Sequence, residues 1–159
     1  MIPRTLYDSD HDMFRDSLRK FIQAEGMPNH EQWEKDGMVS DEIWLKAGEQ
    51  GFLCPMVPEE YGGVGTDFLY NCIVNEEIGR SGCTGLGWTL HNDITVPYIV
   101  RYGSEEQKQK YLPRCITGEL ITAISMSEPG AGSDLQGTKT TAVLDGDHYI
   151  LNGSKTFIT

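Results

Sequence analysis

Apolar residues recur at helical spacing along most of the chain up to about residue 113. Between residues 10 and 24 the apolar positions lie three or four apart, which predicts an amphipathic helix that ends at Gly26-Met27-Pro28. The same criteria predict further helices over residues 40–50, 67–79, 85–91, 96–101 and 104–113. Asp8, Ser9 or Asp10 can cap the first helix, and Ser104 with Gln107 forms a capping-box pattern at the last. This part of the chain is therefore predicted to be an all-helical domain.

From residue 120 the helical spacing is lost and short β-like runs replace it. The apolar stretch 120–126 and the final run 155–159 each predict a strand. Between them, Thr141 and Val143 fit one strand and Tyr149 and Ile150 fit another, and the intervening Asp145-Gly146 favours a tight hairpin turn. The predicted fold class is α+β, with an all-α domain over residues 1–118 followed by the beginning of an antiparallel β domain over 119–159, truncated where the sequence ends.

A loop rich in glycine, residues 128–134, follows the apolar run and is predicted to bring backbone close to a ligand. Gly130 and Gly132 permit conformations closed to residues with a Cβ, and the free amides of the loop can bind an anion such as a pyrophosphate. Two other phosphate motifs fail at single positions. A Walker loop would need lysine where Thr138 stands, and a dinucleotide fingerprint would need glycine where Leu135 stands.

Composition and charge narrow the class of protein. Hydrophobic residues make up 38% of the 159 residues, as in a globular protein. The formal net charge of −11, spread along the chain, argues against nucleic acid as a partner. No apolar run approaches the roughly 20 residues that span a bilayer, and the amino terminus lacks the pattern of a signal peptide. We therefore expect a soluble intracellular protein without membrane insertion.

Isolated titratable residues predict no metal site. The cysteines and histidines are widely spaced, which indicates free, mostly buried thiols and structural or surface histidines. They are Cys54, Cys72, Cys83 and Cys115, and His11, His30, His91 and His148. Glu76, Glu77, Glu119 and Glu128 are expected to be exposed or to lie in loops.

Four motifs, in order, resemble those of the acyl-CoA dehydrogenase family. They are PEEYGG at 58–63, the stretch 102–119 that contains Tyr102-Gly103-Ser104 and Gly118-Glu119, SEPGAGSD at 127–134, and LNGSKTFIT at 151–159. One such motif would be weak evidence, but four in the same order are strong. The chain is similar to the family's amino-terminal helical domain and to the start of its middle, β-barrel-like domain.

The resemblance implies that FAD is the cofactor. Met126 and Ser127 would touch the pyrimidine side of the flavin, although the family more often has threonine where Ser127 stands. Gly132 and Ser133 would lie near the cofactor pyrophosphate, and Ser133 could also meet the acyl-CoA.

Three further flavin contacts come from the end of the chain. Phe157 would pack against the isoalloxazine, where the family often has tryptophan, and Ile158 and Thr159 would approach its N5 edge. The residue types agree with this assignment, because a flavin needs an apolar wall, hydrogen-bond donors along its ring and amides for its pyrophosphate.

The resemblance also implies an activity, the oxidation of a fatty acyl-CoA thioester to a trans-2-enoyl-CoA. In the family a glutamate base removes the α-proton while a hydride leaves the β-carbon for the flavin. That base belongs to a carboxy-terminal domain, so no catalytic residue is assigned here and the chain alone is expected to be inactive. Leu90, Ile94 and Pro97 are candidate contacts of the acyl chain, and residues 134–140 resemble the long-chain members.

The family's known properties imply partners as well. They are an acyl-CoA substrate, electron-transfer flavoprotein as acceptor, a homo-oligomer such as a homotetramer, a role in fatty acid β-oxidation, and a location in the bacterial cytoplasm or the mitochondrial matrix. Two alternatives stay open. One is an acyl-CoA oxidase or nitroalkane-oxidising flavoprotein of the same fold, and the other is a non-catalytic helical interaction module.

Overall fold

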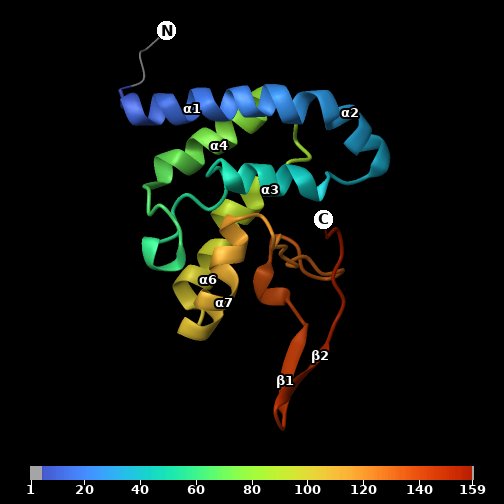
Figure 1. Ribbon diagram of the computed structural model, residues 1–159. Coiled ribbons are helices and arrows are strands. Elements are labelled where there is room, and N and C mark those ends of the chain that lie inside the picture. The colour runs from blue at the N-terminus through green and yellow to red at the C-terminus, as the bar shows by residue number, and fades with distance from the viewer. Residues whose placement is uncertain (1–4, 159) are drawn as a thin grey trace. The chain divides into compact units, whose positions relative to one another are not determined.

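The computed structural model describes residues 5–158 and divides the chain into two compact units, Met1–Thr122 and Ala123–Thr159. The first unit is helical, and the second contains a two-stranded antiparallel sheet (Figure 1). The predicted α+β class is therefore confirmed. The predicted boundary after residue 118 stays a prediction.

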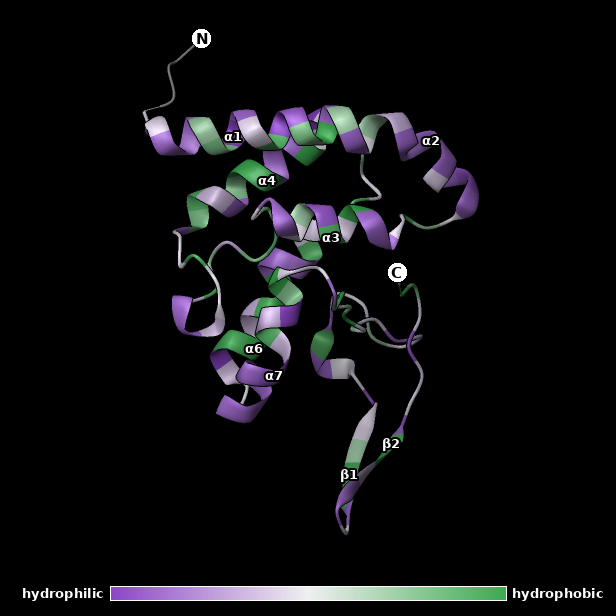
Figure 2. Ribbon diagram, in the orientation of Figure 1, coloured by the Kyte–Doolittle hydropathy of each residue, from purple (hydrophilic) through white to green (hydrophobic). Residues whose placement is uncertain are grey.

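Most helices follow one another with short connections, but the longer stretch 50–67 separates α3 from α4. The α-helices are α1 Ser9–Phe21, α2 Met27–Asp36, α3 Asp41–Glu49, α4 Phe68–Ser81, α5 Trp88–Leu90, α6 Val96–Tyr102 and α7 Glu105–Ile116. Two π-helical turns, Ile22–Gly26 and His91–Thr95, and two 3-10 turns, Glu59–Tyr61 and Leu135–Gly137, complete the helical structure, and the strands are β1 Thr141–Asp145 and β2 His148–Asn152. Both hydropathy colours appear along single helices, as expected of amphipathic elements (Figure 2).

The helical unit has an aromatic core. Trp88 and Phe52 are 0% and 1% exposed, and Trp44 meets Trp88 edge to face with ring centroids 6.5 Å apart. Leu18 of α1 and Ile73 of α4 are fully buried in the same cluster. The apolar faces predicted for the first three helices thus meet in one core.

The first helix does not end at Gly26-Met27-Pro28, so that prediction was wrong. The Met27 N–H bonds the carbonyl of Ile22 across the π-helical turn, and the chain passes directly into α2. Pro28 lies in the first turn of α2, where a missing N–H is least harmful. The Asn29 side chain donates to the Glu25 carbonyl at 2.8 Å. The helix ends only at Gly37, which has a φ of 74°.

The helices predicted over 85–91 and 96–101 are one continuous helix from Trp88 to Tyr102, joined by the second π-helical turn. The last helix likewise passes its predicted end at Pro113 and reaches Ile116. Gly118 follows with a φ of 79°, and a Cβ there would lie 2.3 Å from the Trp44 carbonyl oxygen. This close approach to α3 requires glycine and turns the chain away.

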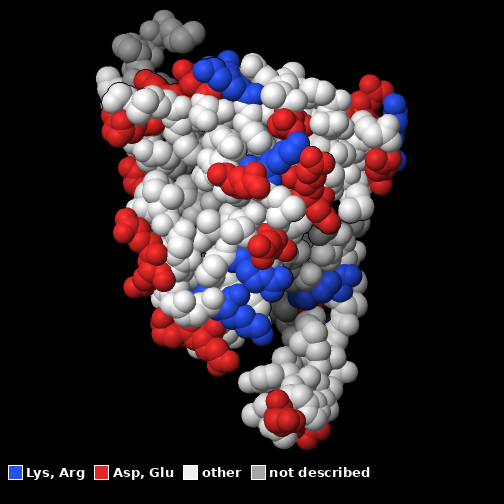
Figure 3. All heavy atoms as spheres, viewed as in Figure 1, with Lys and Arg blue, Asp and Glu red and all other residues white. Residues whose placement is uncertain are grey.

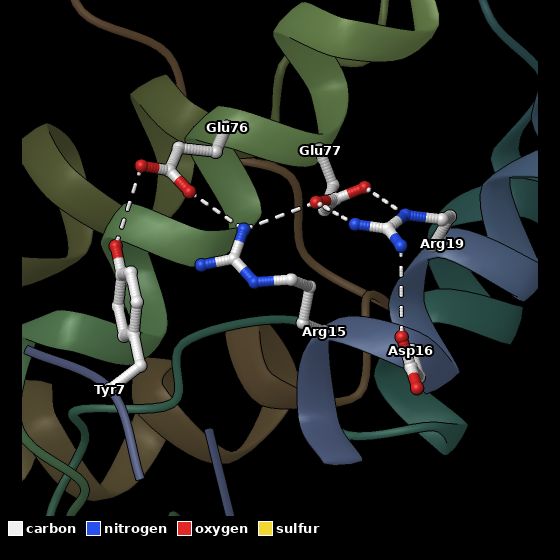
Figure 4. A network of polar contacts seen from close by, with 6 residues as sticks. All are labelled: Tyr7, Arg15, Asp16, Arg19, Glu76 and Glu77. Atoms are coloured by element: carbon white, nitrogen blue, oxygen red, sulfur yellow. Dashed lines mark hydrogen bonds and ion pairs between the residues drawn. The ribbon is translucent and has the colours of Figure 1, made fainter. Parts of the chain in front are cut away.

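A network of ion pairs joins α1 to α4 (Figure 4). Arg19 holds the Glu77 carboxylate in a two-pronged contact of 2.8 and 2.9 Å, and Arg15 bonds Glu77 at 3.1 Å and Glu76 at 2.6 Å. The Glu77 side chain is 2% exposed, so the expectation of an exposed or loop glutamate was wrong for this residue. Sequence spacing missed the network because the partners are about 60 residues apart.

A second link between these helices involves both of their amino-terminal caps. Asp8 caps α1 and Asp67 caps α4, and the buried His11 ring lies 2.7 Å from Asp8 Oδ1 and 3.5 Å from Asp67 Oδ1. Burial alone would lower the pKa of His11, but its hydrogen bonds to the two carboxylates outweigh burial and raise it. The protonated imidazole therefore stabilises the folded state.

This link predicts a loss of stability toward alkaline pH. The pKa of His11 is higher in the folded than in the unfolded state. Its contribution to the free energy of unfolding is therefore complete below the unfolded pKa near 6.5, and it is lost as the pH rises through the folded pKa. Both carboxylates are largely exposed, so we expect about 1 kcal/mol or less. The melting temperatures of the full-length protein and of His11→Gln should differ more at about pH 6 than at alkaline pH. An equal difference in melting temperature at both pH values would show that protonated His11 does not stabilise the folded state.

The second unit contains the β1–β2 hairpin in the register Thr141↔Asn152 to Asp145↔His148. Thr141, Val143, Tyr149 and Ile150 lie in these strands, as predicted, and every strand residue is exposed. The strands predicted over 120–126 and 155–159 are absent from the described residues. A backbone hydrogen bond joins the Thr156 N–H of the second stretch to the carbonyl of Ser127, the residue directly after the first stretch, at 3.0 Å, and one bond does not make a ladder.

Candidate functional site

The loop 128–134 closes on itself. The Glu128 N–H donates to the Ala131 carbonyl at 2.9 Å, and the Ala131 N–H donates back to the Glu128 carbonyl at 3.1 Å. Ala131 is 2% exposed, so it anchors the turn. Asp134 then accepts the Gln136 N–H and begins the 3-10 turn Leu135–Gly137.

The Glu128 carboxylate organises the surrounding backbone. It accepts the Lys139 N–H at 2.7 Å, the Thr140 N–H at 3.0 Å, the Thr140 hydroxyl at 2.5 Å and the Lys155 ammonium at 3.0 Å. Lys155 also donates to the Met126 carbonyl at 3.1 Å. One buried carboxylate thus joins the loop to the segment before β1 and to the segment after β2.

Glu128 lies in a loop, as expected, but its side chain is buried by these contacts and the residue is only 8% exposed. The hydrogen bonds from the Lys139 backbone, the Thr140 hydroxyl and the Lys155 ammonium lower the pKa of Glu128 to about 2. The carboxylate therefore stays charged at any physiological pH. Its donors lie 11 to 27 residues away in sequence, so the only local signal was a carboxylate placed directly before the Pro129-Gly130 turn.

The loop glycines differ from the prediction in one respect. Gly130 and Gly132 do not have a positive φ, so their backbone is open to residues with a Cβ. A Cβ at either position would meet no atom of the described chain within 4 Å. Neither backbone strain nor internal packing explains these glycines, and both leave backbone accessible on the outside of the loop.

The predicted flavin contacts in the second unit lie at its surface. Met126, Phe157 and Ile158 are 42%, 96% and 42% exposed, and Ser133 is exposed. Phe157 has a φ of 55°, which is uncommon for a residue with a Cβ. Thr159 lies outside the described residues.

Hydrogen bonds bring two of the predicted segments together. The Thr156 N–H reaches the Ser127 carbonyl, and Lys155 reaches the Met126 carbonyl and Glu128. Met126 and Ser127 therefore lie beside the segment that carries Phe157. Near this junction a Cβ at Gly153 would lie 2.2 Å from the Thr140 hydroxyl oxygen, so Gly153 is required by close approach.

The predicted acyl-chain contacts lie in the helical unit. Leu90 and Pro97 are half-buried and Ile94 is 42% exposed, whereas Trp88 and Val96 on the same helix are buried. The three candidates thus share a face that the described residues of this unit leave partly uncovered.

His91 is a structural histidine, as the sequence indicated. It is fully buried, its Nε2–H donates to the Cys115 carbonyl at 3.0 Å, and its Nδ1 accepts from the Thr122 hydroxyl at 2.8 Å. Burial lowers the pKa of His91, so the ring is neutral. It ties the π-helical turn to the end of α7.

The other isolated residues form no metal site within residues 5–158, where no group of three or more histidine, cysteine or acidic side chains is arranged to hold an ion. All four thiols are free, with Cys72 partly exposed and the others buried. No helix among the described residues is long and apolar enough to cross a membrane. Acidic and basic side chains are interspersed on the face in Figure 3.

Comparison with known proteins matches this architecture. Residues 8–119 match the family model "Acyl-CoA dehydrogenase, N-terminal domain", and residues 123–159 match "Acyl-CoA dehydrogenase, middle domain". The chain belongs to the acyl-CoA dehydrogenase family. The resemblance carried by the four motifs is confirmed.

Curated relatives in the acyl-CoA dehydrogenase family include a long-chain specific acyl-CoA dehydrogenase, mitochondrial, from Sus scrofa, which is 54% identical over 156 residues. The match covers 98% of this chain and 36% of that protein. A mitochondrial isovaleryl-CoA dehydrogenase from Bos taurus is 41% identical over 155 residues, with 96% and 36% covered. The chain thus spans about a third of the length of these relatives.

Solved structures of family members share the fold closely. An acyl-CoA dehydrogenase from Geobacillus kaustophilus has a TM-score of 0.93 at 55% identity, with 98% of this chain and 41% of that chain covered. A second, from Bacillus anthracis and complexed with FAD, has a TM-score of 0.90 at 39% identity, with 99% and 28% covered.

Proposed function

We propose that the full-length protein is an FAD-dependent acyl-CoA dehydrogenase that oxidises a saturated fatty acyl-CoA to a trans-2-enoyl-CoA. The observation that carries the proposal is the Glu128-centred assembly. It holds a loop with accessible backbone beside a segment that exposes the Phe157 side chain almost completely.

The residues fit the cofactor. Gly130 and Gly132 lack a Cβ where nothing in the described chain requires glycine, which suits the approach of a pyrophosphate to the loop amides. Met126 and Phe157 present apolar surface, and Ser127 adds a hydroxyl. FAD would supply the hydride acceptor when bound.

We propose an individual role for each of these residues, carried over from the family resemblance. Met126 and Ser127 would bind the pyrimidine side of the flavin, and Gly132 and Ser133 its pyrophosphate, with Ser133 also near the acyl-CoA. Phe157, Ile158 and Thr159 would cover the isoalloxazine and its N5 edge. Leu90, Ile94 and Pro97 would contact the acyl chain, and their partly exposed shared face supports this role.

The wider setting is proposed from relatives. The fatty acyl chain and a role in β-oxidation are supported by relatives named as long-chain specific enzymes. An electron-transfer flavoprotein as acceptor is supported by a solved structure of similar fold, "Electron transferring flavoprotein of Acidaminococcus fermentans: Towards a mechanism of flavin-based electron bifurcation". The proposal also includes a domain boundary near residue 118 and a homotetramer. The location is proposed to be the cytoplasm or the mitochondrial matrix, because both mitochondrial and Bacillus subtilis relatives match.

The proposal predicts a coloured protein. The purified full-length protein should show flavin absorbance, and anaerobic addition of a saturated acyl-CoA should bleach it because the substrate reduces the cofactor. Absorbance spectra before and after addition test this, with free CoA as the control that should leave the spectrum unchanged. A protein that neither retains nor takes up FAD would refute the proposal.

A further inference from the structure

The π-helical turn His91–Thr95 carries three successive polar residues that bind three different parts of the helical unit. His91 reaches the end of α7 and Thr122, as described above. Asn92 is 3% exposed, accepts the Cys54 N–H at 2.8 Å and donates to the Phe52 carbonyl at 3.1 Å. π-Helical turns inside α-helices are frequent at functional sites, so a turn anchored this heavily calls for a functional explanation.

Asp93 makes the third anchor, and its contacts are unusual for a carboxylate. It accepts the Asn71 amide at 2.5 Å and the Asn75 amide at 2.6 Å, both from α4. Among residues 5–158 no cationic side chain lies within ion-pair distance of it. Burial raises the pKa of Asp93, against the opposing effect of the two amides. Asp93 is half-buried, and two neutral amides of α4 instead of a cation hold its two carboxylate oxygens.

The residues on either side of these anchors face elsewhere. Leu90, Ile94 and Pro97 follow one another at spacings of four and three, so they share a helix face, and all three remain half-buried or exposed. The rotation of the helix about its axis decides where this apolar face points. Asp93 and Asn92 fix that rotation because their side chains are bound to fixed backbone and side-chain groups.

We propose that Asp93 is a positioning residue for acyl-chain recognition, which sets the apolar face of Leu90, Ile94 and Pro97 through its paired bonds to Asn71 and Asn75. This inference rests on the proposed function. A long acyl chain would contact more of this face than a short one, so its binding depends more strongly on the rotation of the helix. Asp93 therefore acts on the preference for chain length and not on the chemical step.

The amides allow a test with a conservative variant. The Oδ1 atoms of Asn71 and Asn75 are both buried without a hydrogen-bond partner. In Asp93→Asn, one amide can rotate and offer its Oδ1 to the new N–H₂ group, so the paired contact is retained. In Asp93→Ala both contacts are lost, and the turn keeps only the weaker bond from the Asn71 amide to the Asn92 carbonyl at 3.4 Å.

Calorimetry of the full-length holoprotein with unreactive octyl-CoA and hexadecyl-CoA thioethers measures the preference for chain length without turnover. Asp93→Ala should reduce the preference for hexadecyl-CoA over octyl-CoA by roughly tenfold, since misplaced contacts along a hydrophobic pocket change discrimination by about that factor. Asp93→Asn should keep the wild-type ratio. Glu77→Gln, which destabilises α4 without touching the turn, should keep it as well. Steady-state assays with the matching acyl-CoA substrates should show the change in KM and little change in kcat.

Three results would overturn the inference. If Asp93→Ala loses affinity equally for both thioethers, the ratio of the two affinities is unchanged and Asp93 has only a structural role. Binding of the thioethers by the wild type would still support the proposed function. No wild-type affinity for either thioether would remove the proposed function and the inference with it. If Asp93→Ala does not fold, Asn75→Ala removes only the 2.6 Å contact and should shift the ratio in the same direction by a smaller factor; an unchanged ratio there would also overturn it.

Discussion

Replacing Glu128 by glutamine should release most of the FAD from the full-length protein. Four donors converge on this carboxylate, and a glutamine has one acceptor oxygen and an N–H₂ group that would face donors. The loop, the segment before β1 and Lys155 would then separate. We expect FAD affinity to fall on the order of 10- to 100-fold, the range for lost hydrogen bonds to a charged group.

Fluorescence titration of the apoprotein with FAD measures this effect. Asp147→Asn is the matched control, because it neutralises a fully exposed carboxylate in the same unit and should leave the affinity unchanged. Unaltered FAD affinity in Glu128→Gln would show that the loop does not depend on this carboxylate, or that the cofactor binds elsewhere.

Replacing Glu77 by glutamine should lower the stability of the helical unit by about 2 to 3 kcal/mol, somewhat less than is typical for breaking a buried ion pair. The variant leaves Arg15 and Arg19 without their shared buried partner, but Arg19 is 34% exposed and water can solvate part of its charge. Burial would raise the pKa of Glu77, and its bonds to the arginines outweigh this and lower it. The contribution is therefore present above the unfolded pKa near 4.5 and lost as the pH falls.

Urea unfolding of the full-length protein, followed by far-UV circular dichroism, measures the loss. Glu31→Gln is the control, since it breaks the 2.7 Å pair with Lys35 on exposed α2 and should change stability by less than about 0.5 kcal/mol. A similar loss of stability in the two variants would show that the α1–α4 network contributes no more than an exposed ion pair.

Much of the helical unit was predictable because burial repeats at helical spacing. The exceptions lie at proline. The first helix was predicted to end at Pro28, and the helix that contains Pro97 was predicted to be separate from the one before it. Both helices are continuous, because a π-helical turn precedes each proline and shifts the hydrogen bonds. This compensation involves the backbone and leaves no pattern in the residue types.

The candidate site was predictable to a smaller extent. The motifs marked the segments around Ser127 and Phe157, whose proximity the hydrogen bonds then show. The role of Glu128 could not be predicted, since its donors come from residues 139, 140 and 155, and a carboxylate in a loop is most often solvated. The strands predicted over 120–126 and 155–159 failed for a related reason, because a strand depends on partners that its own sequence does not specify.

The contact between Gly153 and Thr140 also bears on how the hairpin selects its alignment. Thr141 pairs with Asn152, so Gly153 stands opposite Thr140 at the open end of the two strands, in a space too small for a Cβ. A residue with a Cβ at position 153 would collide with Thr140 there, so replacing Gly153 would oppose the observed alignment. Both strands are exposed on both faces, so burial offers little discrimination between alignments. Gly153 is therefore a steric condition for the observed pairing, because it lets the open end of the hairpin close against Thr140.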